Sequence, residues 1–221
     1  SFTILFLACT GLSLCAFFSS CMLKGRESTG NEEETAGHNS AFFEKNIITP
    51  SIMNFFQNFV WGALIAFFPL YAIQHGIQNP GIFFSANAIM LIATRTLGGK
   101  ILDTFSKERI ILASILGAII AMVTLSFSRT LLAIITVGML WGISGSFFFP
   151  ASMSYALDYA GSTSGAAVGT FRALSDLGLA LGPVVIGIII PFTGYQAMFL
   201  LLALMCLGNM GYFQFYVRKI R

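Results

Sequence analysis

The sequence of 221 residues is 56% hydrophobic and 10% charged, whereas an ordinary soluble domain carries about 25% charged residues. This composition excludes a soluble globular fold for most of the chain. The net charge is +3. The basic residues that produce it are grouped by position along the chain, which argues against a basic patch for nucleic acid. Because no nucleotide-binding loop, HExxH or GxSxG sequence occurs, we expect neither an enzyme nor a bound cofactor or metal.

Seven apolar stretches follow one another along the chain, and each approaches or exceeds the roughly 20 residues that a helix needs to cross a bilayer. Lipid offers the backbone no hydrogen-bond partners, so such stretches form helices, whereas the strands of a barrel would alternate in polarity. The sequence predicts an all-α polytopic membrane protein, with spans over residues 2–22, 51–74, 81–102, 110–127, 131–153, 164–190 and 196–217.

A polar segment separates the first span from the other six, and its Gly, Ser, Asn and Glu residues cannot bury enough apolar surface to fold alone. We therefore expect a transmembrane helix over residues 1–23, a linker over residues 24–50 and a six-helix block over residues 51–221. Pro50 is expected to open the second span. The chain begins at Ser1 and its first span has no basic start or cleavage site of a signal peptide, so we expect a piece of a longer protein.

The basic residues lie almost entirely on one side of the predicted spans. Lys and Arg in short loops favour the cytoplasmic side of a membrane. Alternating connections place Arg129 alone on one side, and nine basic residues on the other: Lys24, Arg26, Lys45, Lys100, Lys107, Arg109, Arg218, Lys219 and Arg221. We therefore expect the linker and the C-terminus to be cytoplasmic.

The connection after the third span reads RTLGGKILDTFSKER, residues 95–109. It resembles the loop motif of the major facilitator superfamily, G-x-x-x-D-R/K-x-G-R-R/K, with Gly99, Asp103 and Lys107 in their places. Three other positions depart from the motif, as in the weaker copy that this family carries in its second half. The resemblance implies that this loop is the cytoplasmic connection between helices eight and nine of such a protein.

The sixth span contains GTFRALSDLGLALGPVVIG, residues 169–187, which resembles the glycine-proline motif of the same family. Small side chains let two membrane helices approach closely, and a proline removes one backbone donor and permits a bend. We expect helix packing by Gly169, Gly178, Gly182, Pro183 and Gly187. The family's antiporters carry this motif in helix five, whereas the order here makes it helix eleven, so antiport does not follow from it.

One helix, a linker and six helices resemble helix six and the C-terminal half of a major facilitator superfamily transporter. The resemblance implies secondary active transport of a small solute by alternating access, coupled to a proton gradient. Its partners would be membrane lipid, the N-terminal half, a small-molecule substrate and protons. Bacterial exporter-like members suggest drug or metabolite efflux in an inner membrane. The alternative is a non-transporting scaffold or receptor-like relic of a transporter half.

Polar residues inside the spans are candidates for a substrate or proton cavity, because a polar group in lipid is costly unless it faces protein or water. Arg172 and Asp176 lie about 12 Å and 18 Å into their span, one helical turn apart. They could pair with each other or line the cavity. Amides of the second span could equally be packing contacts between helices. The candidates are Asn54, Gln57, Asn58, Trp61, Asn87, Arg172 and Asp176, with Trp141 as a weaker one.

Charged residues at the cytoplasmic ends of the spans are candidates for a gate. We expect Arg95 to pair with Asp103 or Asp158, and Asp103 to face the helix start near residue 164, where the helix dipole favours an anion. Simple anchoring of long basic side chains at the interface is the alternative. The candidate gate consists of Arg95, Gly99, Asp103, Lys107, Arg109 and Asp158.

Overall fold

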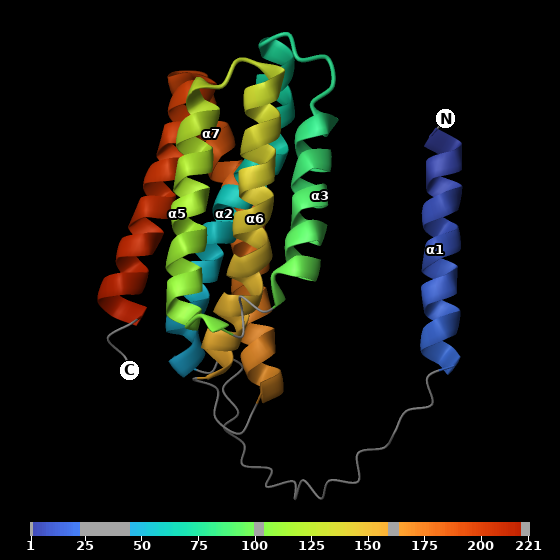
Figure 1. Cartoon of the computed structure of the whole chain (residues 1–221), viewed down its shortest axis with the longest axis vertical. Helices are drawn as coiled ribbons and strands as arrows, with labels where there is room; N and C mark the ends of the chain where they lie inside the picture. Colours follow the sequence, from blue (N-terminus) through green and yellow to red (C-terminus); the bar gives the residue numbers. More distant parts are fainter. Residues whose placement is uncertain (1, 23–44, 100–103, 159–163, 218–221) are drawn as a thin grey trace, which may run out of the picture. The chain divides into compact units, whose positions relative to one another are not determined.

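The structure, a computed structural model, describes residues 2–22, 45–99, 104–158 and 164–217. The chain divides into two compact units, residues 1–39 and 40–221. The first unit contains helix α1, Phe2–Met22, which is labelled in Figure 1. Within this unit, apolar side chains such as Phe6 and Leu12 are exposed, as expected of a helix whose neighbours are lipid tails.

Helix α2 spans Lys45–Gln74 and starts before residue 51, where the sequence predicted its beginning. Pro50 therefore lies inside the helix and does not open it, although a proline there removes one backbone hydrogen bond. The extra turn has a reason in packing. The side chain of Ile47 is fully buried in a small cluster with Ala156, Ala167 and Phe171, and this burial favours helix over linker at residues 45–50.

The next three helices agree with the predicted spans to within a few residues. They are α3 (Gly81–Leu97), α5 (Lys107–Phe127) and α6 (Leu131–Leu157). A short connection joins α5 to α6, and the Thr130 hydroxyl accepts a hydrogen bond from the Ala133 amide at the start of α6. Such side-chain caps satisfy one of the backbone donors that a helix N-terminus leaves free. Because the connection between them is short, helices α5 and α6 run antiparallel.

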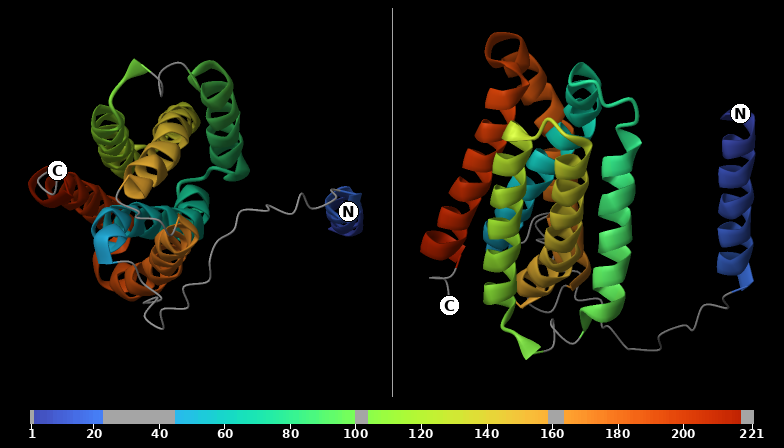
Figure 2. Two further views of the ribbon diagram at one scale, coloured as in Figure 1. Left: turned by 90° about the horizontal axis from the view of Figure 1, so that it is seen from below. Right: turned by 45° about the horizontal axis from the view of Figure 1, so that its top comes forward.

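The two last predicted spans form one element, α7, which covers Ser164–Tyr212 and continues into the π-helical segment η1, Phe213–Val217. Its backbone leaves the helical region at Gly194, where φ is 76°. Glycine adopts this conformation without the penalty of a Cβ. The chain reverses direction there, so α7 consists of two arms that run in opposite directions (Figure 2).

Packing of these helices confirms an all-α fold, and no strand occurs among the described residues. Helix α2 packs mainly against α7, while α6 packs against both α3 and α5 (Figure 2). Within the described parts of the chain, four stretches are long and apolar enough to cross a membrane: Ile47–Gln74, Lys107–Phe127, Leu131–Leu157 and Ala167–Val217. The chain is an integral membrane protein.

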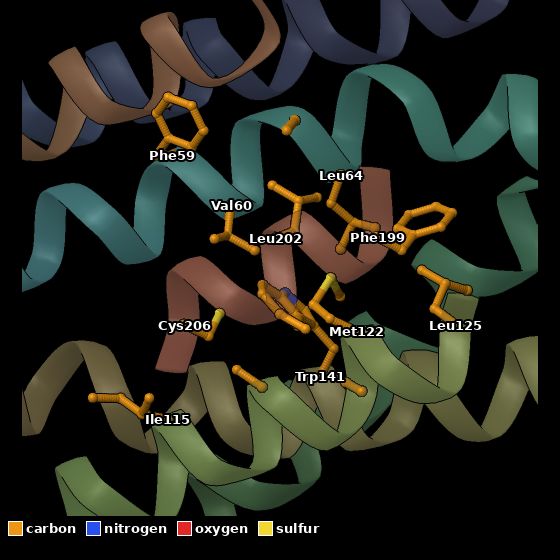
Figure 3. Packing of buried hydrophobic residues seen from close by; sticks show 14 of the residues in the cluster. Phe59, Val60, Leu64, Ile115, Met122, Leu125, Trp141, Phe199, Leu202 and Cys206 are labelled. Atoms are coloured by element: carbon orange, nitrogen blue, oxygen red, sulfur yellow. The ribbon is translucent and has the colours of Figure 1, made fainter. Parts of the chain in front are cut away.

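The main core lies where α2, α5, α6 and the second arm of α7 meet (Figure 3). Leu64, Met122, Phe199 and Leu202 are fully buried there. At one end of this core, the Tyr71 hydroxyl lies 2.5 Å from the Ser128 carbonyl oxygen, beyond the end of α5. This bond ties α2 to the α5–α6 connection.

Candidate functional site

A pocket of about 220 Å³ lies between α2, α3 and α6. Five of the residues predicted to line a cavity also line this pocket: Asn54, Gln57, Asn58, Trp61 and Asn87. The first four lie on one face of α2, because residues three and four positions apart share a helix face. Trp141, the weaker candidate from α6, lines the pocket as well.

Two tryptophans form the aromatic wall of this pocket. The rings of Trp61 and Trp141 stack with centroids 5.8 Å apart and planes 15° from parallel. Phe84 of α3 meets Trp61 edge-on, with a centroid distance of 6.5 Å. Stacked and edge-on arrangements are the favourable geometries for aromatic pairs. The pocket therefore presents a flat apolar surface that suits a planar group.

The amides of α2 supply its polar wall. Asn54 is fully buried, and its side-chain nitrogen donates to the Ser175 hydroxyl of α7. The Asn58 side chain donates to the Asn54 carbonyl oxygen at 2.9 Å. In contrast, Asn54 Oδ1 and Gln57 Oε1 are buried and have no hydrogen-bond partner among the described residues. A buried acceptor without a partner costs about 1–3 kcal/mol, so these oxygens would gain from any hydrogen-bond donor that reached them.

Three polar residues near these amides were not predicted from the sequence. Ser175 accepts the hydrogen bond from Asn54. Asn209, in the second arm of α7, donates to the Met53 carbonyl oxygen at 3.0 Å. Ser51 is fully buried one turn before Asn54. The rule that singled out the α2 amides, a polar group inside an apolar span, would have found Asn209, whereas Ser175 has no signal in a sequence rich in serine.

Arg172 and Asp176 do not form an ion pair, although the sequence allowed one. Both side chains are exposed on the first arm of α7. The Arg172 guanidinium lies 4.7 Å from the centroid of the Phe149 ring, a distance typical of a cation–π contact. Phe149 itself lines the pocket, so Arg172 touches its wall from outside. Neither Arg172 nor Asp176 is among the described lining residues.

At the end of the bundle where α5 begins, Asp158 pairs with Lys107. The Lys107 Nζ lies 2.8 Å from both carboxylate oxygens. The antiparallel arrangement of α5 and α6 brings these residues together, since one starts α5 and the other ends α6. The expected partner of Asp158, Arg95, instead lines the pocket. The predicted pairing of Arg95 with Asp158 is therefore wrong, while the alternative pairing with Asp103 lies outside the described residues.

The other residues of the candidate gate are placed differently. Gly99 and Arg109 are exposed. Gly99 has no described heavy atom within 4 Å of the position of a Cβ. Asp103 lies outside the described residues. The described part of the candidate gate therefore contains one ion pair, with both side chains more than a third exposed, and surface pairs contribute at most about 1 kcal/mol.

The glycines of the sixth predicted span differ in their surroundings. A Cβ at Gly178 would overlap the Phe55 carbonyl oxygen of α2, and one at Gly182 would overlap that of Phe59. Gly187 is less tight, with a Phe67 ring carbon 3.2 Å from its Cβ position. Gly169 has open space among the described residues.

Pro183 belongs to the same contact. Its ring lies 3.1 Å from a Cβ built at Gly62 of α2. Gly62 also faces the Leu179 carbonyl oxygen so closely that a Cβ would overlap it. Small residues on both helices thus allow the backbones of α2 and α7 to touch. The backbone of α7 is helical at Pro183 and departs from helix at Gly194.

Together these features define a helical membrane protein with a small pocket inside its bundle. Among the described residues there is no group of three or more His, Cys, Asp or Glu side chains that could hold a metal. Residues 51–220 match the sequence profile of the Major Facilitator Superfamily. The chain belongs to this family of membrane proteins.

The curated relatives include one protein named for export and others named for multidrug resistance. The staphylopine export protein of Staphylococcus aureus is 29% identical over 167 residues, which are 72% of this chain and 42% of the relative. The multidrug resistance protein MdtG of Proteus mirabilis is 27% identical over 147 residues, 63% of this chain and 37% of the relative. The multidrug resistance protein MdtG of Yersinia enterocolitica is 22% identical over 192 residues, which are 84% of this chain and 46% of the relative. The chain thus spans less than half the length of these relatives.

Proposed function

We propose that the chain forms helix six and the C-terminal half of a secondary transporter that exports a small organic solute. The order of elements supports this assignment: α1 precedes a long connection and a bundle of six antiparallel arms, formed by α2, α3, α5, α6 and the two arms of α7. The relatives that match include a staphylopine export protein and multidrug resistance proteins. An N-terminal half would complete the cavity.

The observation that carries this proposal is the composition of the pocket between α2, α3 and α6. Gln57 Oε1 and Asn54 Oδ1 offer acceptors without described partners, and the Trp61–Trp141 stack offers a flat apolar wall. A ligand with both a planar apolar group and N–H or O–H donors would satisfy both walls. Pockets of this kind fix orientation by a few polar groups and gain affinity from apolar contact.

The proposed mechanism of transport is alternating access. One half rocks against the other, and the pocket faces each side of the membrane in turn. Asp176 is the proposed proton-binding residue, since its carboxylate is exposed on the first arm of α7 and carries no described ion pair. The Lys107–Asp158 pair would hold the cytoplasmic side closed. The proposed location is a bacterial inner membrane, with linker and C-terminus cytoplasmic.

Efflux of ethidium, a planar dye with amino donors, tests the proposal. Bacterial cells that make the complete protein should retain less dye than matched cells without it, and staphylopine should be tested in parallel. The Trp61→Ala variant should abolish the difference at equal amounts of protein in the membrane. Equal retention of both compounds by cells with and without the wild-type protein would favour a non-transporting scaffold or receptor.

A further inference from the structure

A second, larger pocket of about 500 Å³ lies between α5 and α6, away from the residues that form the polar pocket. Its walls are apolar side chains of both helices, with Ile110 and Ala113 on α5 and Leu140 and Ile143 on α6. Among the described residues, Arg109 is the one charged side chain that lines it. The volume falls within the range of about 300–1,000 Å³ that is usual for ligand sites.

The groove has a charged end and a closed apolar end. Arg109 lies in the first turn of α5, and Gly117 lies about 12 Å further along the helix axis. At Gly117 the two helices touch, because a Cβ there would overlap the Ser144 hydroxyl of α6. That hydroxyl is already used, since it donates to the Leu140 carbonyl oxygen at 2.9 Å. The floor of the groove therefore suits hydrocarbon.

The charged end is free to bind an anion. Arg109 is exposed and forms no ion pair with a described residue, whereas the neighbouring cation Lys107 is held by Asp158 at 2.8 Å. Phe105, which is 51% exposed, lies beside the mouth of the groove. In the proposed topology this end of the bundle lies at the cytoplasmic headgroups, where basic residues between membrane helices attract anionic lipid.

We propose that this groove binds one anionic phospholipid of the cytoplasmic leaflet. Its phosphate pairs with the Arg109 guanidinium, and one acyl chain lies along the groove toward Gly117. Charge complementarity selects an anionic headgroup over a zwitterionic one, because the guanidinium pairs with the phosphate and a choline cation would offset that charge. The apolar walls hold the chain by van der Waals packing, since surrounding hydrocarbon gives no hydrophobic drive. The lipid site shares no lining residue with the solute pocket. Its test therefore does not depend on the transported substrate.

Lipid binding to the complete protein in detergent, measured by native mass spectrometry, tests this site. The probes are phosphatidylglycerol and phosphatidylcholine with identical acyl chains. We expect phosphatidylglycerol to bind more tightly, and Arg109→Gln to weaken it by about fivefold, the value of one basic contact at a membrane surface. Arg129→Gln is the matched control, since it removes an exposed arginine from the connection between α5 and α6 at the other end of the bundle.

A second variant tests the acyl-chain part of the site. Ala113→Trp fills the groove while Arg109 stays, and we expect it to reduce phosphatidylglycerol binding. Leu116→Trp places the same ring on an exposed position of α5 that does not line the groove, and should leave binding unchanged. Any one of three results would overturn the proposal. The first is equal binding of the two lipids, the second is equal losses for Arg109→Gln and Arg129→Gln, and the third is equal binding by the two Trp variants.

Discussion

The backbone of α7 at Gly182 lies directly against the Phe59 carbonyl oxygen of α2, so that no side-chain carbon fits between them. Gly178 makes the same kind of contact with Phe55 one turn earlier. Lipid supplies no hydrophobic drive between membrane helices, so close backbone packing is a main source of their association. The contact also positions Ser175, which holds Asn54 at the edge of the polar pocket.

Gly182→Ala should destabilise the protein by about 1–3 kcal/mol, the usual cost of forcing extra atoms into a packed interface. Thermal unfolding of the purified protein in detergent measures the effect as a lower midpoint. Gly169→Ala is the matched control on the same arm, because its Cβ meets no described atom within 4 Å. Equal midpoints for the two variants would show that the contact between α2 and α7 does not require glycine.

Sequence reasoning found the helices because a membrane span must be long, apolar and free of charge, and the structure confirms the all-α fold. It misplaced the start of α2 because Pro50 is a local signal, whereas the burial of Ile47 against Phe171 depends on tertiary contacts. For the same reason, a spacing of glycines could not separate Gly182, which touches α2, from Gly169, which has open space. Local patterns specify elements, and packing specifies where their residues face.

Sequence reasoning predicted some contacts of the candidate site and missed others. Amides on one face of α2 stand out in an apolar span, and they do line a common pocket. The partner of Asp158 did not stand out, because several basic residues are predicted at the same end of the bundle. The choice of Lys107 over Arg95 follows from the way α5 and α6 are aligned, which periodicity alone does not fix.

Gln57→Leu separates ligand binding from folding. The variant removes a buried oxygen that has no described partner, so we expect unchanged or slightly higher thermal stability, since burying such an oxygen costs free energy. Ethidium efflux, in contrast, should fall at least several-fold if the oxygen accepts a hydrogen bond from the substrate.

Asn209→Leu is the matched control for this change. It removes an amide whose nitrogen donates to the Met53 carbonyl oxygen and whose own oxygen has no described partner. We expect a loss of up to about 1.5 kcal/mol of stability, the net value of one hydrogen bond. A Gln57→Leu variant that is destabilised as strongly as Asn209→Leu would assign Gln57 to helix packing and not to a substrate site.

The Lys107–Asp158 pair should contribute little to stability. Both groups are more than a third exposed, so water and salt screen their attraction. A double-mutant cycle with Lys107→Gln and Asp158→Asn, measured by thermal unfolding, should give a coupling energy below about 1 kcal/mol. The coupling should weaken further in high salt. A larger value that does not respond to salt would mean that the pair is buried in the complete protein.

Asp176→Asn tests proton coupling, and the position of Arg172 makes the test selective. Because Arg172 lies over the Phe149 ring and does not pair with Asp176, removing the carboxylate should leave the arginine contact intact. In vesicles that contain the complete protein, we expect the variant to lose ethidium transport driven by a proton gradient while it retains dye binding. Arg172→Gln should keep the response to the gradient. Unimpaired transport by Asp176→Asn would move the coupling site elsewhere, and equal loss in both variants would mean that the two residues act as a pair during transport.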